Sequence, residues 1–95
     1  AIDPPDINRS DKVFDVVEAM AKDGNPNSVS DAGVGALSAR SAVLGAFLNV
    51  KINAAGLKDR EAAQTLIDQA AQIAERAISR EKEILAVVES VIASN

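Results

Sequence analysis

The chain has 95 residues and a formal net charge of −4, so it forms one small domain and is a poor candidate for binding a phosphate backbone. Aromatic residues make up only 2% of the chain, which also argues against a stacking surface for single-stranded nucleic acid. Cysteine and histidine are both absent, which excludes disulfides, Cys/His zinc sites and a Ser-His-Asp triad within this chain.

A first helix is predicted over about residues 8–22, after two prolines that mark an extended entry. Ser10 is the expected N-cap, with Asp11 in the first turn, where the helix dipole favours a negative charge. Gly24 is expected just past the helix end, where a left-handed conformation is common, and Pro26 then stops the helix. The predicted apolar face has four members at helical spacing: Val13, Val16, Val17 and Met20.

A second helix is predicted over about residues 28–55, ending at Gly56. Its apolar residues surround the helix almost completely, which predicts a buried central helix. Arg40 is the only charged residue between positions 32 and 50, and it lies near the middle of that stretch. A charge at the centre of a membrane span costs about 2.5–3.5 kcal/mol, so a membrane helix is the less favoured interpretation.

A third helix is predicted over about residues 58–93, with two apolar stripes and with Arg80 interrupting the first of them. At about 1.5 Å per residue this helix is about 55 Å long, whereas a compact domain of this size has a radius of gyration near about 12 Å. We therefore expect something else to pack on it, either another copy of the chain or a missing part of the protein. The second stripe comprises Ile67, Ala74, Ile78, Leu85, Val88 and Ile92.

These elements predict an all-α fold: a helical bundle with one buried central helix and one long C-terminal helix. Residues 1–95 hold at most one domain. The first residue is Ala1 and no basic start precedes an apolar run, so we expect no signal peptide and a processed or truncated chain.

The polar groups of the central segment are the candidates for chemistry, because charges over residues 58–95 are interleaved as on a solvated helix face. Ser28, Ser30 and Asp31 have two interpretations. They cap the second helix, with a hydroxyl three residues before a carboxylate, or they form the polar rim of a pocket beside free backbone N–H groups.

Three further polar residues lie inside the apolar second helix. Arg40 is either a buried or interfacial ion pair, which we favour, or a contact for an anion. Asn49 and Asn53 are four residues apart on one helix face. Their amides need partners, which hydrogen bonding to a neighbouring helix supplies more readily than a ligand does.

The segment 24–34, with the sequence GNPNSVSDAGV, is followed at 48–53 by LNVKIN. The two segments together resemble the cyclodeaminase/cyclohydrolase family of folate enzymes, which includes the deaminase domain of formimidoyltransferase-cyclodeaminase and bacterial methenyltetrahydrofolate cyclohydrolases. The resemblance covers about residues 12–95. Family members are longer, and the part that carries their glycine-rich turn is absent here, so the chain resembles the C-terminal half of such an enzyme.

The resemblance implies an all-helical bundle that dimerises and one of two reactions on a tetrahydrofolate substrate. A cyclodeaminase converts formimidoyltetrahydrofolate to methenyltetrahydrofolate and ammonia, and a cyclohydrolase opens methenyltetrahydrofolate to formyltetrahydrofolate. Neither reaction needs a metal or a further cofactor. On this basis Asp31 is the predicted catalytic residue, with its carboxylate stabilising positive charge. The predicted substrate-binding residues are Asn27, Ser30, Arg40, Asn49 and Asn53.

Two other functions remain open: a non-catalytic helical dimerisation or scaffold module, and a helical binder of a small ligand. The Asn-Pro-Asn turn and the two amides inside an apolar helix favour an enzyme or a binder over a scaffold. The expected partners are the missing N-terminal half and further copies of the chain, as a homodimer or higher homo-oligomer, with no nucleic acid and no membrane. The expected location is the cytoplasm.

Overall fold

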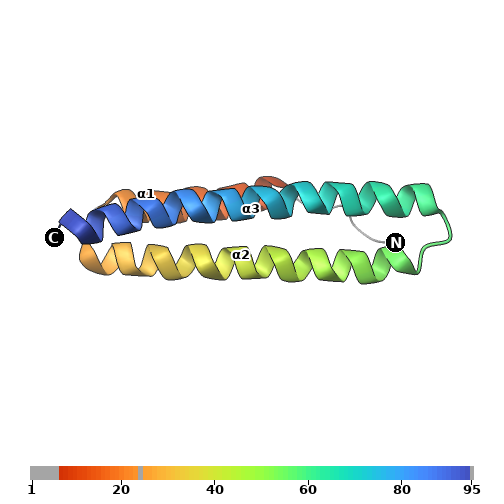
Figure 1. The fold of residues 1–95 in the computed structure, drawn as a ribbon, viewed down its shortest axis with the longest axis horizontal. Coiled ribbons are helices and arrows are strands. Elements are labelled where there is room, and N and C mark those ends of the chain that lie inside the picture. Colours follow the sequence, from red (N-terminus) through yellow and green to blue (C-terminus); the bar gives the residue numbers. More distant parts are fainter. Residues whose placement is uncertain (1–6, 24, 95) are drawn as a thin grey trace.

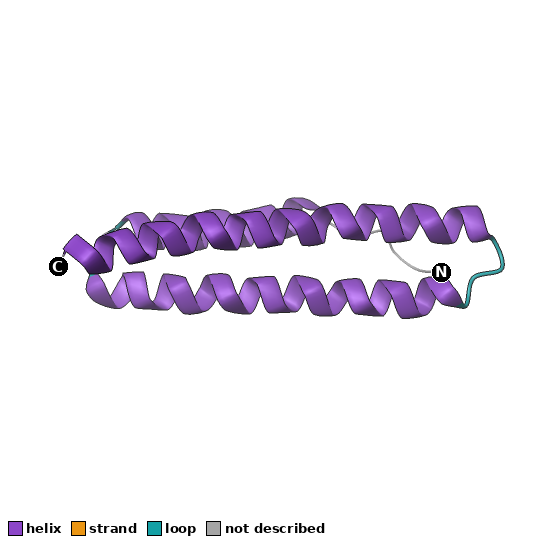
Figure 2. Ribbon diagram, in the orientation of Figure 1, coloured by secondary structure: helices purple, strands orange, loops and turns teal. Residues whose placement is uncertain are grey.

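The computed structural model describes residues 7–23 and 25–94, and within them the chain forms three helices and no strand. They are α1 (Ile7–Lys22), α2 (Pro26–Ala55) and α3 (Arg60–Ser94), coloured by type in Figure 2. The predicted all-α bundle is confirmed, and each helix end lies within two residues of its predicted position. Gly24, the expected end signal of the first helix, lies outside the described residues.

The molecule is a rod of 56 × 17 × 14 Å rather than a globule. Helices α2 and α3 run antiparallel along nearly the whole rod, while the shorter α1 lies against the half that holds the start of α2 and the end of α3 (Figure 1). The radius of gyration is 15.9 Å. A compact domain of this length has a value near about 12 Å, so the length of α3 does stretch the fold.

The observed helix ends contradict the N-cap predicted for α1 and confirm the glycine predicted at the end of α2. Ser10 is not an N-cap, because α1 begins at Ile7, and no acidic residue lies in its first turn. Helix α2 does end at Gly56, although that glycine is right-handed, with φ −87°. Asp59 caps α3, because its Oδ1 accepts hydrogen bonds from the backbone N–H groups of Glu61 (3.1 Å) and Ala62 (3.0 Å).

The buried face of α1 differs from the predicted one. Phe14, Val17 and Ala21 are buried, while Val16 is 62% exposed. Val13 and Met20 of the predicted stripe are exposed as well. Both sets have helical spacing, so periodicity alone did not separate them. Phe14 contributes the largest apolar area on this helix, which explains why its side faces the core.

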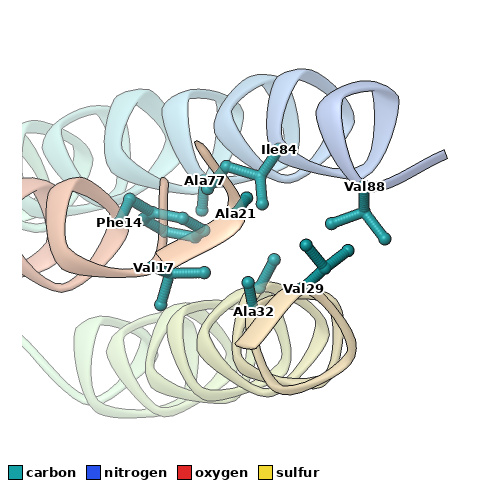
Figure 3. Close-up of a cluster of buried hydrophobic side chains, with 9 residues drawn as sticks. Phe14, Val17, Ala21, Val29, Ala32, Ala77, Ile84 and Val88 are labelled. Atoms are coloured by element: carbon teal, nitrogen blue, oxygen red, sulfur yellow. The ribbon is translucent and has the colours of Figure 1, made fainter. Parts of the chain in front are cut away.

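One cluster of buried side chains joins the three helices (Figure 3). Small residues let the helices approach closely. A Cβ placed on Gly35 would lie 3.3 Å from a methyl group of Val17, so a glycine suits the contact between α1 and α2. The members of the cluster are Phe14, Val17, Ala21, Val29, Ala32, Ala36, Ala77, Ile84 and Val88.

Helix α2 is not buried all round, contrary to the sequence-based prediction. Only the side that faces α1 and α3 is covered, and the opposite side holds four large apolar residues in contact with solvent. We call this side, residues 27–53 away from α1 and α3, the outward face of α2. The four residues, with their exposed fractions, are Val34 (61%), Leu37 (48%), Leu48 (59%) and Ile52 (71%).

Among the described residues one helix, spanning Asn27–Ala55, is long and apolar enough to cross a membrane by length and composition. Its neighbours argue for a different environment. Arg40, near the middle of α2, pairs with Glu81 of α3, and α1 and α3 carry charged residues along their length. We therefore describe α2 as a bundle helix with one unpartnered apolar side.

Candidate functional site

The start of α2 is fixed by Asn25 and Pro26, not by the serines. Asn25 is the N-cap, with extended backbone (φ −72°, ψ 125°), and its Oδ1 accepts a hydrogen bond of 2.9 Å from the backbone N–H of Asn27. Pro26 occupies the first turn, where its missing N–H costs nothing. Ser28 and Ser30 both lie inside the helix, so the prediction that either one caps it is wrong.

Capping therefore does not explain Asp31. This residue is the sixth of α2, and no acidic residue lies in the first turn of the helix. The backbone N–H groups at the helix start are largely engaged: Asn27 donates to Asn25, and Val29 donates to the carbonyl of Asn25 at 2.8 Å. These two N–H groups of the predicted free patch are therefore not available to a ligand. The polar groups exposed at this end of the helix are the side chains of Asn27, Ser30 and Asp31.

Three of the predicted site residues, Asn27, Ser30 and Asp31, do lie together, within the first two turns of α2, and all are exposed. An amide, a hydroxyl and a carboxylate thus project from one helix end. They can donate, accept and carry negative charge without first breaking a hydrogen bond to a cap. Groups of this kind can orient a polar ligand by hydrogen bonding.

The structure does not bring Asn49 and Asn53 to this cluster. Asp31 and Asn49 are 18 residues apart on α2, which corresponds to about 27 Å along the helix axis. That spacing is five whole turns, so the two residues share the outward face while lying toward opposite ends. Both asparagines are exposed, and within the described part of the chain their side chains make no hydrogen bond to a neighbouring helix. The predicted cross-helix hydrogen bonds are therefore wrong.

Arg40 points the other way, toward α3. Its Nε lies 3.5 Å from Oε2 of Glu81, whose side chain is only 10% exposed. The ion-pair interpretation of Arg40 is confirmed. Neither of these two atoms makes a hydrogen bond in the described structure, so the contact is mainly a charge–charge attraction. Arg40 lies about 14 Å along the axis from Asp31 and is separate from the exposed cluster.

Sequence reasoning missed the charged residues of α3 that hold the bundle together. Arg80 donates to Asp15 at 2.9 Å and to Glu18 at 3.0 Å on α1. Burial acts to lower the pKa of Arg80, but the hydrogen bond and the charges of the α1 carboxylates outweigh it and raise that pKa overall. Glu81, also treated as part of a solvated face, is buried. Its place at an apolar-stripe spacing from Ile84 and Ala77 was the available signal.

Glu18 also has a shifted pKa. A hydrogen bond with Lys22 is the main cause and lowers the pKa of Glu18 below its ordinary value of 4.5, with the charges of Lys22 and Arg80 adding to the effect. A shallow, open hollow of about 240 Å³ lies at this place, lined by Asp15, Glu18, Ala19 and Lys22. It includes none of the predicted site residues. No group of three or more acidic residues suited to holding a metal ion occurs among the described residues.

The profile of the formiminotransferase-cyclodeaminase family matches residues 6–72. This chain belongs to that family. The matched region contains the whole of α2 and therefore every residue predicted for the site. The resemblance drawn from the two segments at 24–34 and 48–53 is thereby confirmed.

A methenyltetrahydrofolate cyclohydrolase of Methylorubrum extorquens is 49% identical over 53 residues, which are 56% of this chain and 26% of that protein. The aligned part of the chain thus spans about a quarter of the length of the curated relative. No solved structure matches the chain. The fold described above therefore rests on the chain's own structure, and its membership of the folate family rests on sequence.

Proposed function

We propose that this chain is part of a one-carbon folate enzyme that deaminates formimidoyltetrahydrofolate or hydrolyses methenyltetrahydrofolate. The family match over residues 6–72 is the observation that carries the proposal. The structure supports it at one point: Asp31 is exposed beside Asn27 and Ser30 and is not needed to cap α2. Because the Asp31 carboxylate caps no helix and forms no ion pair within the described residues, it is available to take part in a reaction.

In both reactions, positive charge moves between nitrogen and carbon. In the deamination, one folate nitrogen attacks the formimidoyl carbon carried by the other, and that carbon releases ammonia after its nitrogen has been protonated. In the hydrolysis, water adds to the methenyl carbon and one carbon–nitrogen bond of the bridge breaks. We assign to Asp31 the stabilisation of the cationic carbon centre and the transfer of a proton. Asn27 and Ser30 orient the folate by hydrogen bonding.

The proposal includes partners and location. The chain works with the rest of a longer enzyme and with a second copy of itself, in the cytoplasm, on a tetrahydrofolate substrate. We propose no resident cofactor and no metal, nucleic-acid or membrane partner. Arg40 is assigned to its ion pair with Glu81 rather than to the substrate.

A second candidate function is a non-catalytic helical dimerisation module, which the exposed apolar residues of α2 favour. Val34, Leu37, Leu48 and Ile52 are exposed on one side of the helix, in two pairs toward its ends. Such a module leaves Asp31 without a role, since the carboxylate neither caps the helix nor makes an ion pair within the described residues. Replacing Asp31 therefore separates the two functions.

A chimera tests the proposal. The segment of this chain that matches the Methylorubrum cyclohydrolase replaces its counterpart in that enzyme, where 49% of the aligned residues are already identical. We expect the folded chimera to convert methenyltetrahydrofolate or to release ammonia from formimidoyltetrahydrofolate, and the active substrate identifies the reaction. A correctly folded chimera with neither activity, while the parent enzyme is active in parallel, contradicts the proposal.

A further inference from the structure

Three apolar residues of α1 have no place in the core, although they repeat at helical spacing. Val13, Val16 and Met20 are 46%, 62% and 36% exposed. Valine is a poorer helix former than lysine or glutamate, so the two valines do not stabilise α1 through their helix propensity either. Single exposed apolar residues are ordinary on a protein surface, but three in one stripe on a helix of 16 residues indicate a binding role.

The contact between α1 and α2 places this stripe relative to Asp31. A Cβ on Gly35 would lie 3.3 Å from a methyl group of Val17, so these two positions face each other. Because α1 and α2 run antiparallel, Met20, three residues after Val17, and Asp31, four residues before Gly35, lie toward the same end of the rod (Figure 1). Their levels along the rod differ by only about 1.5 Å.

Met20 and Asp31 also lie on the same side of that contact. Each residue turns an α-helix by about 100°, so Met20 is rotated by about 60° from Val17, and Asp31 by about 40° from Gly35. Both rotations lead away from the buried residues of the helix concerned, and both side chains are exposed. The thioether of Met20 and the carboxylate of Asp31 are therefore neighbours on the outer side of the contact between α1 and α2.

Val13 and Ser38 repeat this arrangement one turn away, on the other side of the contact. Val13 precedes Val17 by four residues and Ser38 follows Gly35 by three, so they too lie at one level and face outward. We call the resulting surface the α1–α2 strip, with an apolar edge on α1 and a polar edge on α2, each about 10 Å long. Gly35, half-buried between the edges, has no side chain to fill the strip. The four residues of the edges are Val13, Met20, Asp31 and Ser38.

We infer that the α1–α2 strip binds the aminobenzoyl ring of the folate substrate, and this inference rests on the proposed function. In methenyltetrahydrofolate the cationic bridge includes the nitrogen that carries this ring. Asp31 forms no ion pair within the described residues, so its negative charge is available to the bridge. A bridge held at Asp31 places the ring beside Met20 and Val13, and the amide that follows the ring comes within reach of the Ser38 hydroxyl.

The apolar edge suits an aromatic ligand. A methionine thioether makes favourable contacts with aromatic rings, and its unbranched chain adapts to a flat ligand. The chain has only two aromatic residues, and neither is available to Met20. Phe14 is buried in the core, and Phe47 lies beneath Lys51, whose Nζ is 4.3 Å from the ring centroid. The aromatic partner of the exposed methionine is therefore supplied by a ligand.

NMR on the whole chain tests the inference directly, because Met20 is its only methionine. A chain that is isotope-labelled at the methionine methyl group gives one signal, which is followed as methenyltetrahydrofolate is added. The ring current of the aminobenzoyl group should move this signal upfield. A tetrahydropterin without the aminobenzoyl group is the control ligand and should leave the signal nearly in place. A methyl signal that does not respond to methenyltetrahydrofolate, with or without shifts in the amide signals of Asn27 and Ser30, overturns the inference.

Steady-state kinetics separates the strip from the reaction itself, in a cyclohydrolase chimera that carries residues 6–72 of this chain. The double variant Val13→Thr with Met20→Gln nearly keeps the side-chain sizes but weakens the apolar contact. Its KM for methenyltetrahydrofolate should rise about fivefold or more with kcat nearly unchanged, while Met20→Leu, which stays apolar, should change KM less than about twofold. Leu48→Gln is the matched control, since Leu48 is 59% exposed and lies about 25 Å along α2 from Asp31.

The outcomes distinguish the two proposals. An inactive chimera contradicts the proposed function, and the assignment of the strip falls with it. An active chimera overturns the assignment of the strip alone if KM is unmoved in the double variant, or if Leu48→Gln raises it as much. The NMR measurement uses the natural chain, so its result does not depend on how the variants fold.

Discussion

At the scale of single residues, Asn25 determines where α2 begins. Ser28 and Ser30 were the expected caps, and the structure places the cap instead at the asparagine ahead of Pro26. A proline suits the first turn and an asparagine suits the position before it, so this choice was available from the sequence. The hydroxyls of Ser28 and Ser30 were preferred as caps, so Asn25 was overlooked.

The cap leads to a stability prediction. Asn25→Ala should lower the free energy of unfolding by about 0.5–2 kcal/mol, because the backbone N–H of Asn27 loses its acceptor. Ser30→Ala is the matched control, and its effect should stay within about 0.5 kcal/mol since Ser30 is exposed and caps nothing. Urea unfolding followed by circular dichroism measures both. Equal losses in the two variants would restore the serine as a cap.

At the scale of elements, periodicity located the three helices but not their buried faces. Helix α1 has adjacent apolar residues, so two stripes of equal spacing compete, and only the arrangement of α2 and α3 selects Phe14 over Val13. In α2 apolar residues occur on every side of the helix, so periodicity does not single out one buried face. The exposed outward face and the wide separation of Asp31 from Asn49 follow from a straight helix covered on one side.

The two glycines in the middle of α2 should respond differently to alanine. Gly45→Ala should raise the free energy of unfolding of the monomer by about 0.5–1 kcal/mol, because the added methyl group meets no atom of the chain. Gly35→Ala should gain less or lose stability, since its Cβ would lie 3.3 Å from Val17. Thermal unfolding at a low protein concentration compares them. A larger gain at Gly35 would contradict the packing of α1 on α2.

Arg80 should matter more than Arg76 for holding α1 in place. The Arg80 side chain is 18% exposed and forms ion pairs with Asp15 and Glu18, while Arg76 is 52% exposed and, among the described residues, forms an ion pair with Asp11 alone. We expect Arg80→Met to cost about 1–3 kcal/mol and Arg76→Met less than about 1 kcal/mol. Amide hydrogen exchange over residues 11–22 reads out the docking of α1. Similar exchange in both variants would contradict a central role for Arg80.

At the scale of the whole molecule, ion pairs between α1 and α3 help to hold the short helix against the antiparallel pair α2 and α3. The rod shape was partly predictable, since α3 is longer than a globule of this size allows. The ion pairs were not predictable, because acidic and basic residues are mostly interleaved along α3, as on a solvated helix face. Glu81 and Arg80 are identified as interior groups only when α1 and α2 are placed against them.

Stability should fall in acid. The folded-state pKa of Glu18 lies below its ordinary value of 4.5, so the stability that it contributes is present above that pH and is lost as the pH falls through the folded-state pKa. Glu18→Gln should therefore be less stable than the natural chain at neutral pH, and the difference should shrink below about pH 4. Urea unfolding at several pH values measures this. A difference that stays constant across the range would show that charge on Glu18 plays no part.

The central claim is that Asp31 serves folate chemistry and not the fold. The direct measurement compares Asp31→Asn with Asp23→Asn in a cyclohydrolase chimera that carries residues 6–72 of this chain, recording turnover and the thermal midpoint of each; both aspartates are exposed. We predict that Asp31→Asn lowers turnover about 100-fold or more with little change in the midpoint, while Asp23→Asn changes neither. Full turnover in Asp31→Asn, with or without a lower midpoint, would contradict the claim.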